Sequence, residues 1–320
     1  MNVRIREFLE MEKEDAIPCY INYCLFHNAN DIKRRIPLYK EAINSHWYQE
    51  LSLEQQKDGS FGRFHAMDAR AEKNARFPTT EAAILRMYDL MIPLRDPVVR
   101  KTVDVIRGYM NGRIPWNERM EKQFGYEIKL KCMAAANLNF LGIKDEFCTE
   151  AKKKCARYLE EMVEEDGSIK KEQWMYRMRR EFDFMLEPES IYIIWLLYKN
   201  DDISPETEKK YLSYQWKNAR TLIKGIPFRA CELKKTNSPE FLKWLTLLEQ
   251  FSQTRIFPEL MGQGAYEFLE QEILDIVEGT ATLPAMQGRI GRYHENWRKQ
   301  SKRRWDLAAR MTRLLLAADR

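Results

Sequence analysis

The stretch Gln56-Lys57-Asp58-Gly59-Ser60-Phe61-Gly62 lies between two helical patterns and predicts a tight turn. A weaker copy of it occurs at Glu165-Asp166-Gly167-Ser168. In Asp-Gly turns the glycine commonly adopts a positive φ, so we expect Gly59 to tolerate replacement by valine poorly. The recurrence of the turn indicates that the chain repeats one unit, which consists of a helix, a short link, a second helix and a longer loop.

Helix signals occur along the whole chain, and strand signals are nearly absent. Several predicted helices begin with a proline, which suits the first turn because its missing N–H would have no intrahelical acceptor there. An aspartate or serine before the proline can cap free backbone N–H groups. These starts are Asp96-Pro97, Glu187-Pro188, Ser204-Pro205, Ser238-Pro239 and Phe257-Pro258.

The predicted helices are of two kinds. Segments such as 131–141 and 191–198 are apolar around most of their circumference, so they must be covered on most sides. Others carry one apolar stripe, for example Val99, Val103 and Ile106, and can face water on the other side. The two kinds alternate four times, as 79–90 with 96–110, 124–141 with 145–162, 189–198 with 204–219, and 238–251 with 258–277.

This alternation of inner and outer helices is typical of stacked helical hairpins. A flanking helix over 39–55 and a closing helix over 297–318 extend the series to about six pairs. We therefore predict an all-α fold, an α/α toroid in which inner helices are ringed by outer ones. The toroid forms one domain over 1–320, with 1–38 as a helical N-terminal arm and 297–320 as the closing C-terminal helix.

The composition predicts a cytoplasmic protein. Of its 320 residues 32% are charged and 44% hydrophobic, which is ordinary for a globular chain. The longest apolar run, 191–198, is far shorter than the roughly 20 residues of a membrane span. The first residues mix Arg4, Arg6 and Glu7 among apolar ones, unlike a secretory signal. The six cysteines include no Cys-x-x-Cys pair.

The net charge is +5, and much of the excess lies between Arg289 and Arg320. The basic residues of the last helix could bind nucleic acid or an anionic membrane, but we favour a closing helix whose solvated side is basic. We expect no nucleic-acid partner. The small loop Gly288-Arg289-Ile290-Gly291-Arg292 could hold an anion, although a connector is the more economical interpretation.

The stretch Gln55-Gln56-Lys57-Asp58-Gly59-Ser60-Phe61-Gly62 resembles the QW-type repeat of the terpenoid cyclase and protein prenyltransferase superfamily. In that motif a glutamine precedes Asp-Gly-Ser, and an aromatic-glycine pair ties successive helices. Asp166-Gly167-Ser168 followed by Gln173-Trp174 is similar to a second, degraded copy. The order around the first copy also resembles bacterial prenyltransferase-like toroid proteins over about 38–166. The resemblance implies an α/α toroid with any ligand in a central cavity.

The catalytic motifs of that superfamily are absent from the sequence. The only Asp pair, Asp201-Asp202, follows Lys199-Asn200 and precedes Ile203-Ser204-Pro205, so neither Asp-x-Asp-Asp nor Asp-Asp-x-x-Asp is formed. No Asp-x-Cys zinc motif exists in the chain. Cys19, Cys24 and His27 are spaced poorly for one zinc ion on a helix, so we predict no metal and no cofactor.

The acidic starts of the inner helices are the candidate site. If the inner helices are parallel, Glu81, Glu127, Glu189 and Glu240 gather at one opening of the cavity, with Tyr192, Trp195 and Trp244 on the wall. The functional interpretation is an acidic funnel or a pair of catalytic acids, and the aromatic rings could stack on a ligand. The structural interpretation is that each glutamate stabilises a helix start and that the aromatic residues are core.

We therefore predict a toroid protein that binds a hydrophobic or sugar-like small molecule in its central cavity and lacks the standard cyclase and prenyltransferase motifs. The first alternative is a non-catalytic interaction or scaffold protein, which would have a centre filled by side chains. The second is a carbohydrate-active hydrolase or lyase with an α/α barrel. The sequence leaves open whether the protein is an enzyme, what its ligand is and which oligomeric state it adopts.

Overall fold

The protein is all-helical in the parts of the chain that the computed structural model describes, residues 1–27, 32–66, 76–119, 125–218, 228–284 and 292–319. Fourteen helices occur in these ranges. They are α1 (Val3–Glu10), α2 (Ala16–Phe26), α3 (Ile32–Ala42), α4 (His46–Glu54), α5 (Thr80–Asp89), α6 (Pro97–Met110), α7 (Tyr126–Phe140), α8 (Glu146–Met162), α9 (Lys171–Glu181), α10 (Ile191–Leu197), α11 (Pro205–Asn218), α12 (Phe241–Phe251), α13 (Phe257–Glu278) and α14 (Gln300–Ala318).

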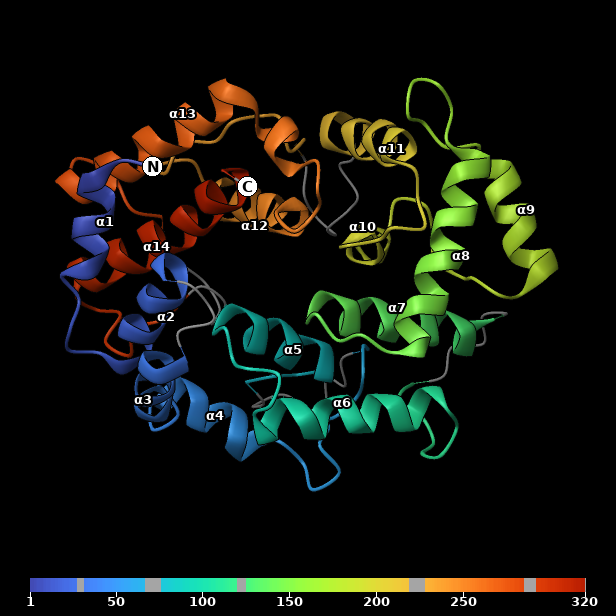
Figure 1. Ribbon diagram of the computed structural model, residues 1–320, viewed down its shortest axis with the longest axis horizontal. Coiled ribbons are helices and arrows are strands. Elements are labelled where there is room, and N and C mark those ends of the chain that lie inside the picture. Colours follow the sequence, from blue (N-terminus) through green and yellow to red (C-terminus); the bar gives the residue numbers. More distant parts are fainter. Residues whose placement is uncertain (28–31, 67–75, 120–124, 219–227, 285–291, 320) are drawn as a thin grey trace.

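The helices lie in an inner and an outer set. Figure 1 shows α5, α7, α10, α12 and α14 toward the middle of the molecule and α4, α6, α8, α11 and α13 toward its rim. Among the inner helices, α7 packs on α10, α10 on α12 and α12 on α14. The predicted difference in apolar coverage is visible in the burial. Nearly the whole second half of α7 is buried, whereas α8 buries only one face.

Several helix starts follow the predicted capping chemistry. Asp96 accepts a hydrogen bond from the backbone N–H of Val98, and Pro97 opens α6. Asp145, which was not among the predicted caps, acts in the same way and accepts from the N–H of Cys148 at the start of α8. Each side chain replaces a backbone acceptor that the first turn of a helix lacks, and such a cap typically contributes about 1 kcal/mol.

The two related turns have the same hydrogen bonds. In the first, the N–H of Gly59 donates to the carbonyl of Gln56 at 2.9 Å, and Asp58 Oδ1 accepts from the N–H of Ser60 at 2.9 Å. In the second, Gly167 donates to Glu164 at 2.9 Å, and Asp166 accepts from Ser168 at 2.9 Å. The predicted positive φ is confirmed, with 99° at Gly59 and 84° at Gly167.

Both turns also pack against the next outer helix. A Cβ at Gly59 would lie 2.4 Å from the carbonyl oxygen of Lys101 in α6, and one at Gly167 would lie 2.2 Å from that of Lys210 in α11. The side chain of Gln55 ties the first turn to α6, because its Nε2 donates to the Val98 carbonyl at 2.8 Å and to Thr102 Oγ1 at 3.0 Å. Glycine at the turn therefore sets how closely two hairpins approach.

The first and last described helices meet. Helix α1 packs on α13 and α14, and α2 packs on α14. Lys302 in α14 pairs with Glu12 at 2.7 Å and Asp15 at 2.9 Å, in the link between α1 and α2. The imidazole of His294 is fully buried between Asp306 Oδ1 at 2.5 Å and Glu12 Oε2 at 2.9 Å. We call these five residues, Glu12, Asp15, His294, Lys302 and Asp306, the terminal clasp.

Two helix predictions need correction, and one helix was missed. The single helix predicted over 39–55 is wrong, because the chain breaks between α3 and α4, where Ser45 accepts from the N–H of Tyr48 and starts a new helix. The inner helix predicted over 189–198 is shorter, since Ser190 caps it and α10 ends at Leu197. Helix α9 was not predicted from the sequence at all. Phe124, Ala219 and residues 288–291 of the predicted basic loop lie outside the described residues.

The basic side chains of the last helix were expected to face solvent, but several of them do not. Arg310 is 4% exposed and pairs with Glu249 at 2.5 Å, and Arg304 Nε donates to the carbonyl of Ile276 at 2.6 Å. Helix α14 is therefore buried on most sides, and part of its charge is used inside the protein. None of the described helices has the length and the apolar composition that crossing a membrane requires.

We expect Gly59→Val to lower the free energy of unfolding by more than about 3 kcal/mol, because valine would add both backbone strain and a clash with α6. Gly112→Val is the control. Gly112 also has a positive φ, of 73°, but a Cβ there meets nothing within 4 Å, so only the strain of about 1 to 2 kcal/mol should remain. Denaturant titration of both variants measures the difference. Equal losses would contradict the role of the close approach.

Candidate functional site

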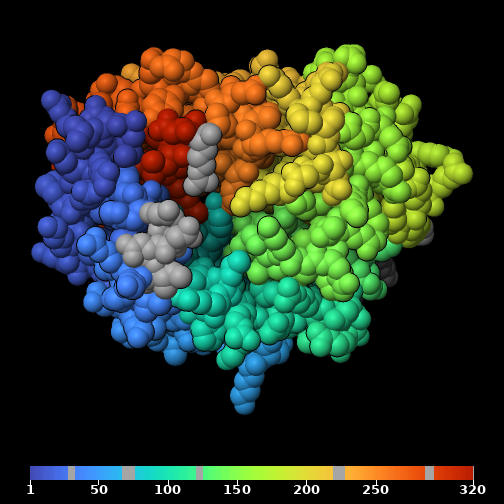
Figure 2. All heavy atoms as spheres, in the orientation of Figure 1, coloured from blue at the N-terminus to red at the C-terminus, as the bar shows by residue number. Residues whose placement is uncertain are grey.

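A large cavity lies at the carboxyl ends of the inner helices. It has a volume of about 1310 Å³ and is lined at or just beyond the last residues of α2, α5, α7, α10, α12 and α14. The carboxyl ends of these six helices therefore face one space. Figure 2 shows a recess near the centre of this face, between the blue N-terminal helices, the red C-terminal helix and the green and yellow middle of the chain. We call it the carboxyl-end cavity.

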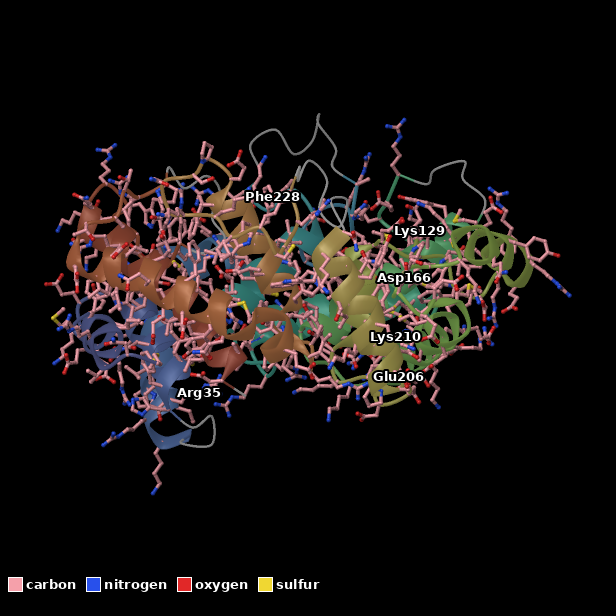
Figure 3. All side chains as sticks on the ribbon, turned by 90° about the horizontal axis from the view of Figure 1, so that it is seen from above. Arg35, Lys129, Asp166, Glu206, Lys210 and Phe228 are labelled. Carbon is pink, nitrogen blue, oxygen red and sulfur yellow. The ribbon has the colours of Figure 1, made fainter. Side chains whose placement is uncertain are left out.

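A second cavity lies where two inner helices begin. Its volume is about 630 Å³, and its lining includes Lys129 and Met133 from the first turns of α7 and Ser190 and Tyr192 from the start of α10. We call it the amino-end cavity. Figure 3 shows Lys129 and Arg35, which line the amino-end and the carboxyl-end cavity respectively, on opposite sides of the molecule.

The carboxylate of Glu81 is the centre of a hydrogen-bonded group at the wall of the amino-end cavity. Its Oε1 accepts from the hydroxyl of Tyr192 at 2.6 Å and from Nδ2 of Asn137 at 2.8 Å. Its Oε2 lies 2.8 Å from Nδ1 of His65. Tyr192 and His65 also line the cavity. Three side chains from three parts of the chain are therefore oriented by one carboxylate.

Local backbone contacts hold this group in place. Glu81 is the second residue of α5, two residues after the cap formed by Thr79. The N–H groups of Thr80 and Glu81 donate to the carbonyls of Arg63 and Phe64, at 2.8 and 3.1 Å. This fastens the segment that contains His65 to the start of α5.

The pKa values of the two wall residues, Tyr192 and His65, are raised for different reasons. Burial, together with the charge and hydrogen bond of Glu81, raises the pKa of Tyr192 well above 10.0, so its hydroxyl remains a donor. For His65, burial acts to lower the pKa, but the hydrogen bond and charge of Glu81 outweigh it and raise the pKa above 6.5. Nδ1 of His65 faces Glu81. The other ring nitrogen, Nε2, has no partner among the described residues and can therefore form a hydrogen bond with a ligand.

The four predicted glutamates have different surroundings. Glu189 lines the amino-end cavity beside Tyr192 and pairs with Lys171 at 3.1 Å. Glu127 pairs with Lys131 at 3.0 Å, one turn along α7, and is 57% exposed. Glu240 accepts from the hydroxyl of Ser238 at 2.6 Å, at the start of α12. Glu81 is the one of the four that gathers donors from three separate segments.

The aromatic candidates also differ. The ring of Trp195 packs edge-on against Tyr192 at 5.3 Å between centroids, and its Nε1 donates to Gln250 Oε1 at 2.8 Å. Nε1 of Trp244 donates to the carbonyl of Ala230 at 2.9 Å. Both indoles are buried, and neither lines one of the two cavities above, whereas Tyr192 does.

One group of side chains has the spacing of metal ligands. Among the described residues, only Glu12, Asp15 and His294 bring three ligand-type atoms within 4.8 Å of one another. The ammonium group of Lys302 lies 2.7 and 2.9 Å from the two carboxylates, where a cation would bind. This cluster is therefore neutralised by the protein itself and belongs to the terminal clasp.

No known family model, curated protein or solved structure matches this chain significantly.

We expect the pKa of His65, followed by NMR titration of its ring protons, to lie above 6.5 in the wild-type protein. In Glu81→Gln it should fall, because burial and Lys129 lower the pKa and only the weaker charge effect of Glu118 still opposes them. Glu127→Gln should leave it unchanged. A raised folded-state pKa means that the His65–Glu81 pair stabilises the fold fully below pH 6.5, and that this contribution is lost as pH rises through the folded-state value. An unchanged pKa in Glu81→Gln would contradict the pairing.

Proposed function

We propose that the protein binds a sugar-like small molecule in the amino-end cavity. The observation that carries the proposal is the group in which Glu81 orients Tyr192 and His65 at the cavity wall. A binding site needs polar groups held at fixed positions in a concave surface of suitable size, and about 630 Å³ is within the range of small-molecule sites.

The lining favours a hydroxylated ligand over a wholly hydrophobic one. Beside Tyr192 and His65 it carries Ser190, Glu189 and the ammonium groups of Lys129 and Lys171. An apolar ligand would desolvate these groups without satisfying them, which costs free energy. A sugar can donate to the carboxylate, accept from the ammonium groups and place its C–H face on the apolar lining residues Met133, Leu186 and Ile191.

We also propose that the helices form a closed α/α toroid of the kind found in the terpenoid cyclase and protein prenyltransferase superfamily. Two observations support the arrangement. The carboxyl ends of the five inner helices, and of α2, face one cavity, as expected if the inner helices are parallel. The contacts of α1 and α2 with α14 join the two ends of the series. The matching turns at Gly59 and Gly167 support a relation to the QW-type repeat.

We also propose that the protein is cytoplasmic, which is supported by its six free cysteines.

The alternative of a non-catalytic interaction protein predicted a centre filled by side chains. We favour a small-molecule binder, because cavities of about 1310 and 630 Å³ lie at the two ends of the inner helices, although the side chains between them are buried.

Ligand-observed NMR with glucose, galactose, mannose and N-acetylglucosamine, and with geraniol as an apolar probe, tests this proposal. We expect at least one saccharide to bind and geraniol not to bind in this cavity. Glu189→Gln should weaken saccharide binding about tenfold or more, since a hydrogen bond to a charged group is lost.

Glu127→Gln is the matched control, because Glu127 also lies at an inner helix start but pairs with Lys131 away from the cavity. It should bind the saccharide like the wild type. Binding of geraniol but of no saccharide, or equal saccharide affinity in all three proteins, would refute the proposal.

A further inference from the structure

The carboxyl-end cavity has a strongly basic lining. Six cationic side chains reach it from separate elements, against one carboxylate, that of Asp201; the cations are Arg35, Lys144, Lys152, Lys199, Arg255 and Arg313. Some of them have partners within the protein. Arg255 pairs with Glu208, and Lys152 donates to the carbonyl of Lys199. Arg35 of α3 and Arg313 of α14 have no such ion pair among the described residues.

Arg35 is held at the cavity wall with donor capacity left over. Its Nη2 donates to the hydroxyl of Tyr20 at 3.3 Å, and its guanidinium lies 6.0 Å from the centre of the Tyr20 ring. Its Nε is buried and has no hydrogen-bond partner among the described residues. A buried donor without an acceptor costs free energy, and an anion in the cavity would remove that cost.

Arg313 has its guanidinium 4.2 Å from the centre of the Tyr88 ring, and no carboxylate lies within ion-pair distance of it in the described parts of the chain. Cys24 connects the two arginines. Burial raises the pKa of its thiol, and Arg35 and Arg313 both act against that rise. Both guanidinium groups therefore act on the same stretch of cavity wall.

Helix dipoles do not account for this pair. Cations near a helix carboxyl end stabilise the helix, which could explain a basic residue there. Arg35, however, lies in the first turn of α3, at the positive end of the dipole, where a cation is unfavourable. The unfavourable free energy of a cation at this end of the helix would be offset by a bound anion.

We propose that the carboxyl-end cavity binds a small organic anion, a carboxylate or phosphate ester with an apolar body, whose anionic group lies between Arg35 and Arg313. Guanidinium groups match the oxygens of both anions through paired N–H donors. The apolar body would lie against Tyr88, Ile92 and Leu141, which line the same cavity. This site is separate from the amino-end cavity and does not depend on the function proposed for it.

Cys24 allows the site to be tested in the wild-type protein, because Cys24 lines this cavity, whereas Cys231 is exposed and does not line it. The protein is alkylated with iodoacetamide in the presence of phenyl phosphate, benzoate, inorganic phosphate or the uncharged benzyl alcohol. Mass spectrometry then gives the rate at each cysteine. We expect phenyl phosphate or benzoate to slow alkylation of Cys24 about tenfold at saturation and to leave Cys231 unchanged.

The affinity of the protective anion is then measured by calorimetry for Arg35→Gln, with Arg35→Lys as the conservative variant and Arg100→Gln, an exposed arginine of α6, as the control. Arg35→Gln should lose about tenfold or more in affinity, Arg35→Lys should recover part of it, and Arg100→Gln should lose none.

Protection by benzoate alone or phenyl phosphate alone identifies the anion. Protection by inorganic phosphate alone would overturn the apolar part of the proposal. Equal protection by benzyl alcohol, absence of protection by every anion, or unchanged affinity in Arg35→Gln would overturn the site. The alkylation arm needs no substitution, so it decides the question even if a variant does not fold.

Discussion

The arrangement of the helices depends on the ion pairs that join the link after α1 to the last helix. A helical hairpin buries its apolar faces only against its neighbours, so the two ends of a series need a partner. Here Lys302 of α14 lies between Glu12 and Asp15, and His294 bridges Glu12 and Asp306. Burial alone would raise the pKa of Glu12, but the bonds from Lys302 and His294 lower it to about 2. Each terminus is thus held by the other.

The clasp is also connected to the middle of the chain. Tyr293, beside His294, donates its hydroxyl to Asp89 at 3.2 Å, and Asp89 pairs with the buried Arg86 of α5 at 2.7 Å. Arg86 Nη2 also donates to the carbonyl of Arg292 at 2.7 Å. The C-terminal segment therefore joins the N-terminal arm to the first inner helix. Because breaking a buried pair leaves a charge without a partner, losing one member costs far more than an exposed pair would.

Much of the helical layout could be predicted from the sequence, because its signals are local. The aspartate cap of α6, the starts at Pro97 and Pro205, and the glycine of the first turn all act within a few residues. The break between α3 and α4 depends on one serine cap inside an otherwise helical pattern. Helix α9 is polar over most of its length, so periodicity gave no sign of it.

The sites were less predictable, because their members meet through tertiary contacts. Glu81 and Tyr192 could be named as candidates from the helix pattern. His65 lies in a segment without regular structure, and nothing in its neighbourhood indicates a bond to Glu81. The carboxyl-end cavity was missed for a similar reason. Whether Arg35 and Arg313 face a cavity or solvent depends on the rotation of two helices far apart in the chain, which a stripe of basic residues does not specify.

Hydrogen–deuterium exchange of the wild type, Lys302→Met and Lys299→Met tests the mutual support of the two termini most directly. Lys302→Met should accelerate exchange at least about tenfold in α1 and α2 as well as in α14, although the substitution lies in α14 alone. Lys299→Met, at an exposed position one residue before α14, should leave α1 and α2 unchanged. Faster exchange confined to α14, or the same response in both variants, would show that the clasp does not hold the ends together.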